Sequence, residues 1–321
     1  MSKLVLYTIP QSVWASAARL VIYELGYEDS VEFMDINLAK GENFLPEFLA
    51  KASPQGGYPR EFFFSSMGLK NLTTAKNPNG ILPTLQTPEG TLTNTTDVIK
   101  YLVVHVRTGT AMKSSNATLI ESLHSDALDP NFAKQMARTD EELASKADKF
   151  LLAFLEGRQR ALEAQSARPE GAPYKDFYDA KKASNGEFLA IVDGSAPVEA
   201  KQAFFDKANA LQETIRSFIY DELPKMLPAL DSDNGHFLSG DLPGETDFHL
   251  AAWLARIFST CGAGQVGNAS ESARDASQKA RDASEKAKAA FGVPLPPTVL
   301  AYWNAWVARP SWGKVYGQGL H

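Results

Sequence analysis

The amino-acid sequence predicts an α/β domain followed by an all-α domain. Up to residue 106, strand and helix patterns follow one another in the order β-α-β-α-β-β-α. From residue 116 onward, helical patterns recur and strand signals almost disappear. A polar stretch, RTGTAMKSSN, separates the two parts and is typical of a linker. We therefore expect one domain over residues 1–106 and a second over residues 116–321.

The chain opens with a predicted strand that leads into a predicted helix. Residues 3–9 alternate in polarity, which is the period of a strand. Residues 14–25 carry apolar side chains at helical spacing, and Gly26 is a natural stop because glycine accepts the left-handed conformation. Ser12 precedes this helix, where a serine hydroxyl typically caps the first turn.

Shorter patterns predict the rest of the first domain. SVEFMDIN, at 30–37, predicts a second strand, and PEFLAKA predicts a short helix that begins at Pro46. Residues 54–75 show no regular pattern and are predicted to be an inserted loop. Residues 81–106, ILPTLQTPEGTLTNTTDVIKYLVVHV, predict a strand, a Pro-Glu-Gly turn, another strand and a helix.

Helical patterns dominate the second domain. They cover residues 116–126, 139–164, 198–226, 247–260 and 297–308. Polar stretches such as SARPEGAPYKDFYDAKKASNGE, at 166–187, are predicted to be loops between them. Inserted segments are expected near residues 165–196 and 262–292.

An alanine-rich repeat lies at 269–290. It reads SARDASQKARDASEKAKAA and places alanines at helical three- and four-residue steps, at positions 273, 276, 280, 283 and 287. A seam of alanines buries little apolar area. We expect a solvated helix lightly packed on the rest of the domain, with a partner-binding helix as the alternative.

Composition and charge exclude several classes of protein. The 321 residues are 44% hydrophobic and 22% charged, as in ordinary soluble globular proteins. The net charge of -6 and the absence of a basic run argue against a nucleic-acid partner. No apolar stretch reaches the length of a membrane span, and the N-terminus does not resemble a signal peptide, so we expect a cytoplasmic protein.

The remaining residue types give no sign of metal or disulfide chemistry. A single cysteine, Cys261, allows no intramolecular disulfide and is expected to be a small buried apolar side chain rather than a nucleophile. The five histidines show no metal-ligand spacing, so no metal site is predicted.

Four stretches together resemble the glutathione transferase superfamily. They are YTIPQSVWASAARLVIYELG, NPNGILPTLQTPEGTL, LTNTTDVIKYL and GDLPGETDFHLAAWLARIF. They occur in the family's order on the predicted elements. The resemblance implies a thioredoxin-like N-terminal domain that binds glutathione and an all-helical C-terminal domain. The pattern most resembles a divergent, serine-type member of fungal type.

The first of these stretches implies the catalytic group. In the family, a hydroxyl or thiol at the start of the first helix activates the glutathione sulfur, and Ser12 holds that position. Tyr7 is the alternative because tyrosine-type classes use a residue at the end of the first strand. A protein without a catalytic hydroxyl is the third possibility. Trp14 is expected to be either a core anchor or a wall of the electrophile pocket.

The second and third stretches imply the glutathione-binding residues. Pro83 resembles the cis-proline of thioredoxin-like folds, which leaves the backbone of Leu82 free to pair with the cysteinyl backbone of glutathione. Asn94 and Thr95 occupy the positions of an acid and a serine that hold the γ-glutamyl group. Asn94 is neutral, and Asp97 is a candidate to supply the missing charge.

Two further positions depart from the family pattern. Asn43 stands where some classes place a basic residue for the glycyl carboxylate, with Lys70 and Lys76 as other candidates. In the fourth stretch, Asp247 holds the third helical position of a capping box, but Gly244 replaces the usual serine or threonine.

The sequence thus supports two hypotheses about function. The first is a glutathione transferase that activates the thiol for attack on a small apolar electrophile, with peroxidase or isomerase activity also open to the same thiolate. The second is a ligand-binding or interaction protein on this fold with little or no turnover. Glutathione is the expected co-substrate, and a homodimer active in detoxification is implied by the family.

Overall fold

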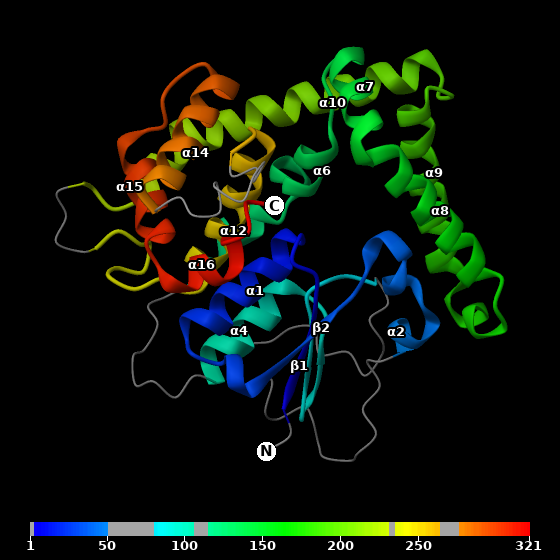
Figure 1. Cartoon of the computed structure of the whole chain (residues 1–321), viewed down its shortest axis with the longest axis horizontal. Coiled ribbons are helices and arrows are strands. Elements are labelled where there is room, and N and C mark those ends of the chain that lie inside the picture. The colour runs from blue at the N-terminus through cyan, green and yellow to red at the C-terminus, as the bar shows by residue number, and fades with distance from the viewer. Residues whose placement is uncertain (1–2, 51–79, 106–114, 231–234, 264–275) are drawn as a thin grey trace. The chain divides into compact units, whose positions relative to one another are not determined.

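The computed structural model of the protein describes residues 3–50, 80–105, 115–230, 235–263 and 276–321 (Figure 1). The chain divides into two compact units. The sheet unit comprises Met1–Ile9, Asp29–Val98 and Gln135–Ala208, and the helical unit comprises Pro10–Glu28, Ile99–Lys134 and Asn209–His321. The inserted loop predicted at 54–75 and most of the predicted linker lie outside the described residues. The domain boundary near residue 106 therefore stays a prediction.

Four strands form one mixed sheet in the sheet unit. They are β1 (Leu4–Thr8), β2 (Val31–Asp35), β3 (Thr84–Thr87) and β4 (Gly90–Leu92). The order across the sheet is β2-β1-β3-β4. β1 runs parallel to β2, whereas β3 is antiparallel to both β1 and β4. The peptide bond from Leu82 to Pro83, just before β3, is cis. This is the thioredoxin-like arrangement, and the predicted fold class is confirmed.

The register of the sheet places its apolar side chains in rows. Leu6 of β1 lies opposite Leu85 of β3, which in turn lies opposite Leu92 of β4, and all three are buried. On the next residue of β1, the ring of Tyr7 packs edge-on against Phe48 of α2 (Pro46–Ala50), with ring centroids 5.7 Å apart. Cross-strand and ring contacts of this kind fix the register.

A helical hairpin covers α2 within the sheet unit. Helices α8 (Leu152–Ser166) and α9 (Lys175–Asp193) lie side by side in Figure 1. The loop predicted at 166–187 is therefore wrong, because α9 occupies most of it. The polar composition of this stretch favoured a loop. Instead, the Asn185 amide nitrogen donates to the Leu155 carbonyl at 3.0 Å, and this buried bond holds the residue in the helix.

The same hairpin is tied to the segment before α2. The Tyr178 hydroxyl donates to the Phe44 carbonyl at 2.6 Å in a buried hydrogen bond. Arg168 forms an ion pair with Glu47 of α2 at 2.7 Å. Polar contacts with residues far away in the sequence thus stabilise α9. Local helix propensity does not take such contacts into account.

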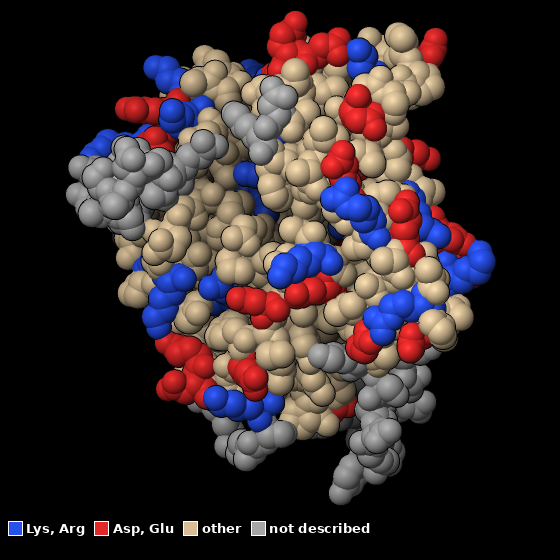
Figure 2. All heavy atoms as spheres, turned by 45° about the vertical axis from the view of Figure 1, so that its right-hand side comes forward, with Lys and Arg blue, Asp and Glu red and all other residues tan. Residues whose placement is uncertain are grey.

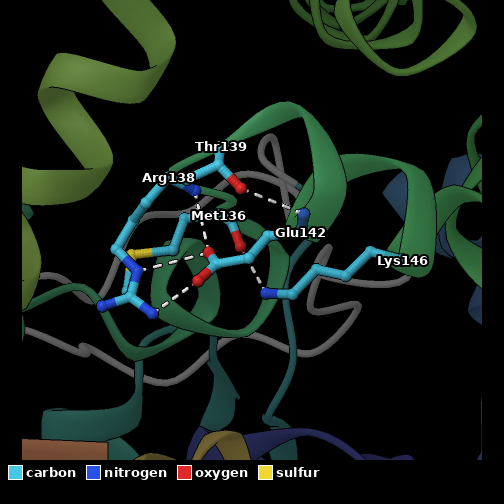
Figure 3. Close-up of polar contacts among 5 residues, drawn as sticks. All are labelled: Met136, Arg138, Thr139, Glu142 and Lys146. Carbon is cyan, nitrogen blue, oxygen red and sulfur yellow. Dashed lines mark hydrogen bonds and ion pairs between the residues drawn. The ribbon is translucent and has the colours of Figure 1, made fainter.

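Helix α7 (Asp140–Lys146) starts with a compact set of polar contacts (Figure 3). The Thr139 hydroxyl accepts the Glu142 amide at 3.3 Å and caps the helix. The Glu142 carboxylate in turn accepts the backbone amide of Arg138 at 2.9 Å and its Nε at 3.2 Å. Lys146 donates to the Met136 carbonyl. The helix predicted over 139–164 continues from α7 through one π-helical turn, Ala147–Leu151, into α8.

The helical unit contains most of the predicted second-domain helices. The helices that lie entirely or almost entirely in this unit are α1 (Val13–Glu24), which was predicted in the first domain, and α5 (Ala117–Leu123), α6 (Pro130–Gln135), α11 (Leu223–Met226), α12 (Glu245–Thr260), α14 (Ala276–Phe291), α15 (Pro297–Val307) and α16 (Pro310–Tyr316). Helices α4 (Thr95–His105) and α10 (Val198–Ser217) belong to both units in sequence. α10 continues through a π-helical turn, Phe218–Glu222, into α11 and accounts for the helix predicted at 198–226.

Helix α12 forms the core of the helical unit. Every residue from Thr246 to Ser259 is buried. α1 packs against it, and α1 also contacts α16. The carboxylate of Glu24, near the end of α1, accepts Arg309 Nε at 2.8 Å and fixes the contact with α16. Gly26 follows α1 with a φ of 70°, so the predicted helix stop is confirmed.

The alanine-rich repeat forms α14. Ala283 and Ala287 are completely buried, and α14 contacts α12 and α15. Other residues of the same helix, such as Lys286 and Lys288, are exposed. This agrees with a helix that packs through a narrow alanine seam. Ala273 lies outside the described residues, and the alternative of a partner-binding helix stays a prediction.

The described helices and the charges on the surface bear on membrane and polyanion binding. None of the described helices combines the length and the apolar character needed to cross a bilayer. On the face drawn in Figure 2, Lys and Arg side chains alternate with Asp and Glu side chains. Mixed charge of this kind gives no field of a single sign to attract a polyanion.

At the start of α12, the side chains of Asp247 and Ser239 take the place of the usual capping serine. The Asp247 carboxylate accepts the backbone amides of Gly244 at 2.9 Å, Leu238 at 2.9 Å and Ser239 at 3.2 Å. A Cβ atom added to Gly244 would lie 2.0 Å from the Ser239 hydroxyl oxygen. The Ser239 side chain therefore fills the space that a serine at position 244 would need, and it also hydrogen-bonds Asp247.

We predict that Gly244→Ser destabilises the protein, although it restores the usual capping residue. The expected loss is about 1–3 kcal/mol in the free energy of unfolding, because the new side chain overlaps Ser239. The double variant Ser239→Gly with Gly244→Ser should recover much of it, since one hydroxyl then occupies the space. Urea denaturation of the four proteins of this cycle measures the coupling. Additive effects of the two changes would contradict the steric explanation.

Candidate functional site

The backbone of Leu82, just before β3, is the first part of the candidate site. The hydrogen bonds found among the described residues include none to the backbone of Leu82. Leu82 is half-buried, and Pro83 after the cis bond is buried. The Thr84 hydroxyl donates to the Ile81 carbonyl at 2.9 Å and closes the turn next to it. Such a free edge can accept an extended peptide as an added strand.

The N-terminus of α4 lies at the same end of the β3–β4 hairpin. Leu85 pairs with Leu92 in an antiparallel register, and continuing that register by two residues brings Pro83 opposite Asn94. The Asn94 side chain accepts the Asp97 amide at 2.9 Å and caps the helix. Its amide nitrogen donates to the Asp97 carboxylate at 2.9 Å. The predicted proximity of Asp97 to Asn94 is thus present.

Thr95 is the first residue of α4 and is buried. Its backbone amide belongs to the first turn of the helix, where amides have no intrahelical acceptor and attract anions. The negative charge of Asp97 lies at the same helix end. This helix start thus presents amide donors beside a carboxylate, a combination suited to a group that carries both charges.

The side chain of Asn43 forms a hydrogen bond within the protein and has no evident ligand-binding role. Its amide nitrogen donates to the Gly80 carbonyl at 3.0 Å, and its side chain is buried. A basic group beside the neighbouring residue is Arg158 of α8, whose guanidinium lies 4.6 Å from the Phe44 ring centroid. No sequence signal pointed to Arg158. Lys70 and Lys76 lie outside the described residues.

Ser12 caps α1, as its position predicts. Its backbone is extended, with φ -85° and ψ 123°, and its hydroxyl oxygen accepts the Ala15 amide at 3.3 Å. A capping bond uses a lone pair of the oxygen and leaves the O–H free to donate. Ser12 can therefore cap the helix and donate a hydrogen bond to a ligand at the same time.

The loop that carries Ser12 is held from two sides within the helical unit. The Ser16 hydroxyl donates to the Pro10 carbonyl at 3.3 Å. Arg256 of α12, which is buried, donates to the Gln11 carbonyl. Burial lowers the pKa of Arg256. Because an arginine guanidinium stays protonated in proteins, it adds positive charge one residue from Ser12. Sequence reasoning missed Arg256, because nothing local distinguishes it from any other helical arginine.

Tyr7 belongs to the sheet unit and is buried. Its hydroxyl donates to Gln86 Oε1 of the neighbouring strand at 3.3 Å. A tyrosine engaged across the sheet would have to exchange this bond to reach a sulfur. Tyr7 stays the alternative to Ser12 as thiol-activating residue.

Trp14 is partly exposed and stacks on a histidine pair that the sequence did not indicate. The ring of Trp14 lies parallel to that of His124, with centroids 3.7 Å apart. His124 Nε2 and His249 Nδ1 are 2.9 Å apart and share a hydrogen bond. Surrounding protein lowers the pKa of His124 to about 4 and the pKa of His249 well below its ordinary value. Both imidazoles are therefore neutral at neutral pH.

Comparison with known proteins gives similarity to solved structures alone. No family model matches the sequence, and no curated protein matches it. Glutathione transferase F7 from Populus trichocarpa is 16% identical, with a TM-score of 0.45 and 97% of each chain covered. The beta-etherase LigF from Sphingobium sp. strain SYK-6 is 13% identical, with a TM-score of 0.45 and 98% of each chain covered. A Sulfitobacter glutathione transferase homolog with bound glutathione is 16% identical, with a TM-score of 0.43, covering 98% of this chain and 97% of that one.

Two of these three structures are described as a glutathione transferase and a glutathione transferase homolog. At such identities and TM-scores the similarity carries no argument about activity, and the function proposed below rests on the residues of the chain itself. The candidate residues divide between the two units. Leu82, Pro83, Asn94 and Thr95 belong to the sheet unit, and Ser12 and Trp14 to the helical unit.

We predict that Ser12→Ala lowers the free energy of unfolding by about 1 kcal/mol, because the first turn of α1 loses its capping acceptor. Ser12→Asn keeps a capping oxygen and should remain close to the original stability. Urea denaturation of the three proteins measures the difference. Equal stability of all three would show that the cap bond contributes nothing.

We also predict that stability falls as the pH is lowered from about 6.5 to about 4. His249 and His124 have depressed pKa values in the folded protein, and the pKa of His321 is also lowered by burial to about 4. In the unfolded chain, histidine takes up a proton near pH 6.5. The unfolded state therefore binds more protons in this range, and acid favours it. Denaturation at several pH values tests this, and His124→Phe should reduce the slope.

Proposed function

We propose that the protein is a glutathione transferase that activates the glutathione thiol for attack on a small apolar electrophile. The observation that carries the proposal is the backbone of Leu82 beside cis-Pro83, to which the described residues make no hydrogen bond, at the same end of the hairpin as the start of α4. A peptide that adds to this edge receives backbone hydrogen bonds. Glutathione is such a peptide and supplies the thiol.

The start of α4 suits the γ-glutamyl group of glutathione. Its carboxylate accepts from the unpaired amides of the first turn around Thr95, and the helix dipole favours that negative charge. Its ammonium binds the Asp97 carboxylate, which Asn94 orients through a 2.9 Å hydrogen bond. In this proposal Asp97 supplies the charge that the neutral Asn94 lacks.

Ser12 supplies the thiol activation in this proposal. An ordinary thiol titrates near pH 8.5 and is ionised to only a few per cent at neutral pH. The Ser12 hydroxyl donates to the sulfur, while the N-terminus of α1 and the Arg256 guanidinium favour the thiolate electrostatically. Lowering the thiol pKa by two units requires about 2.7 kcal/mol of preferential stabilisation of the thiolate.

A titration of bound glutathione tests the proposal. We expect the thiolate absorbance of the complex to appear about 1–2 pH units below that of free glutathione, because the site stabilises the charged form. Ser12→Ala and the cap-preserving Ser12→Asn should both return the thiol pKa toward its free value. A shift that survives in both variants would assign the activation to another group. Absence of glutathione binding would exclude the proposed function.

The second candidate is a binding protein that holds glutathione or an apolar ligand without turnover. The neutral Asn94 at the usual acidic position and the capping bond of Ser12 favour it. Tight glutathione binding with an unshifted thiol pKa would support this candidate over the transferase. A cytoplasmic homodimer that acts in detoxification, with peroxidase or isomerase turnover by the same thiolate, completes the proposal by analogy with the family.

A further inference from the structure

Two cations of the α8–α9 hairpin differ from the others in their partners. The hairpin, residues 152–193, carries six arginines and lysines. Four of them form ion pairs with carboxylates, namely Arg160, Arg168, Lys175 and Lys182. Arg158 of α8 and Lys181 of α9 form neither an ion pair nor a hydrogen bond with any residue in the described ranges. These two charges therefore have no counter-charge within the described protein.

Arg158 and Lys181 lie against a pair of aromatic rings instead. The guanidinium carbon of Arg158 is 4.6 Å from the ring centroid of Phe44, and the Lys181 ammonium is 5.8 Å from that of Phe177. The two rings are neighbours, with centroids 6.2 Å apart. A cation–π contact engages the face of the ring and leaves the N–H groups of the cation able to donate. The hairpin thus brings two sets of N–H donors to one pair of rings.

The two charges are partly withdrawn from water and repel each other. Both side chains are half-buried. Burial lowers the pKa of Arg158 and of Lys181, and the charge of Arg158 lowers the pKa of Lys181 further. Like charges that are desolvated without a counter-charge are unfavourable. An anion bound by both side chains offsets the repulsion and restores the hydrogen bonds lost to desolvation.

We propose that Arg158 and Lys181 bind a phosphate group, either as inorganic phosphate or as the phosphate of a small ester. A phosphate monoester carries a charge of about −1.5 to −2 near neutral pH, which matches two cations. Arginine donates two parallel hydrogen bonds to phosphate oxygens, and lysine adds a point charge. A carboxylate brings a single negative charge and would leave one of the two cations uncompensated.

This site is separate from the groups that the proposed function uses. All four side chains, those of Arg158, Lys181, Phe44 and Phe177, belong to the sheet unit. In the proposed function, the backbone of Leu82 and the start of α4 hold the peptide. Neither Arg158 nor Lys181 takes part in thiol activation there. Phosphate binding can therefore be tested without glutathione.

Isothermal titration calorimetry with inorganic phosphate and with phenyl phosphate, in a phosphate-free buffer, tests the inference. We expect Arg158→Gln and Lys181→Gln each to weaken binding about 10-fold or more, because a charge-assisted hydrogen bond is lost. Arg160→Gln is the matched control. It removes the same charge from the same helix, but the Arg160 side chain is 69% exposed and is paired with Glu156, so the affinity should stay unchanged.

The two probes also distinguish the sources of the phosphate group. Tighter binding of inorganic phosphate assigns the site to the free ion, and tighter binding of phenyl phosphate assigns it to an ester. Either result supports the inference. Absence of binding of both probes to the unmodified protein would overturn it. An equal loss of affinity in Arg160→Gln would also overturn it, because the effect would then be one of net charge.

Thermal unfolding separates loss of the site from loss of the fold. A ligand that binds only the folded state raises Tm. We expect phosphate to raise the Tm of the unmodified protein and of Arg160→Gln, and to leave the Tm of Arg158→Gln and Lys181→Gln unchanged. Lys181→Gln keeps the contact of Arg158 with Phe44, so it tests the site with this packing intact. An equal rise of Tm in all four proteins would contradict the assignment.

A titration in saturating glutathione separates this site from the proposed thiol site. We expect phosphate to bind with the same affinity in the presence of glutathione. Displacement of phosphate by glutathione would overturn the inference, because the two cations would then hold a carboxylate of the peptide. Failure of glutathione itself to bind would exclude the proposed function and leave the phosphate site standing.

Discussion

The burial of α12 is the constraint on which the candidate site depends. A helix whose residues from Thr246 to Ser259 are all buried must find partners inside the protein for each polar side chain that it carries. Asp247 finds three backbone amides, His249 finds His124, and Arg256 finds the Gln11 carbonyl. These hydrogen bonds fix the residues around α12, as its apolar contacts also do.

Two of these interactions involve residues next to those for which we propose a chemical role. Arg256 holds the residue before Ser12, and His249 orients the imidazole on which Trp14 stacks. The helical core therefore positions the start of α1 through polar bonds as well as through packing. The binding edge at Leu82 depends instead on the sheet and on its cis peptide bond, so the two halves of the proposed function have separate structural origins.

The sequence predicts those parts of this arrangement that have local causes. The strands and the stop at Gly26 follow from polarity patterns and from the special backbone of glycine, whereas the cis bond at Pro83 was implied by the resemblance to a family. Helix α9 does not, because its polar composition favours a loop and the buried hydrogen bond from Asn185 that stabilises it joins residues far apart in the sequence. The histidine pair joins residues 125 positions apart, and no spacing rule covers a contact of that range.

The hydroxyl of Ser12 serves the fold through its lone pair, and its O–H remains for chemistry. The capping role of Ser12 and its proposed role in thiol activation thus use different parts of one hydroxyl group. During evolution, a change of Ser12 to Asn or Asp would remove the O–H and keep a capping oxygen at the helix start. A lineage could therefore pass from an enzyme to a stable binding protein in one substitution, without crossing an intermediate that folds poorly.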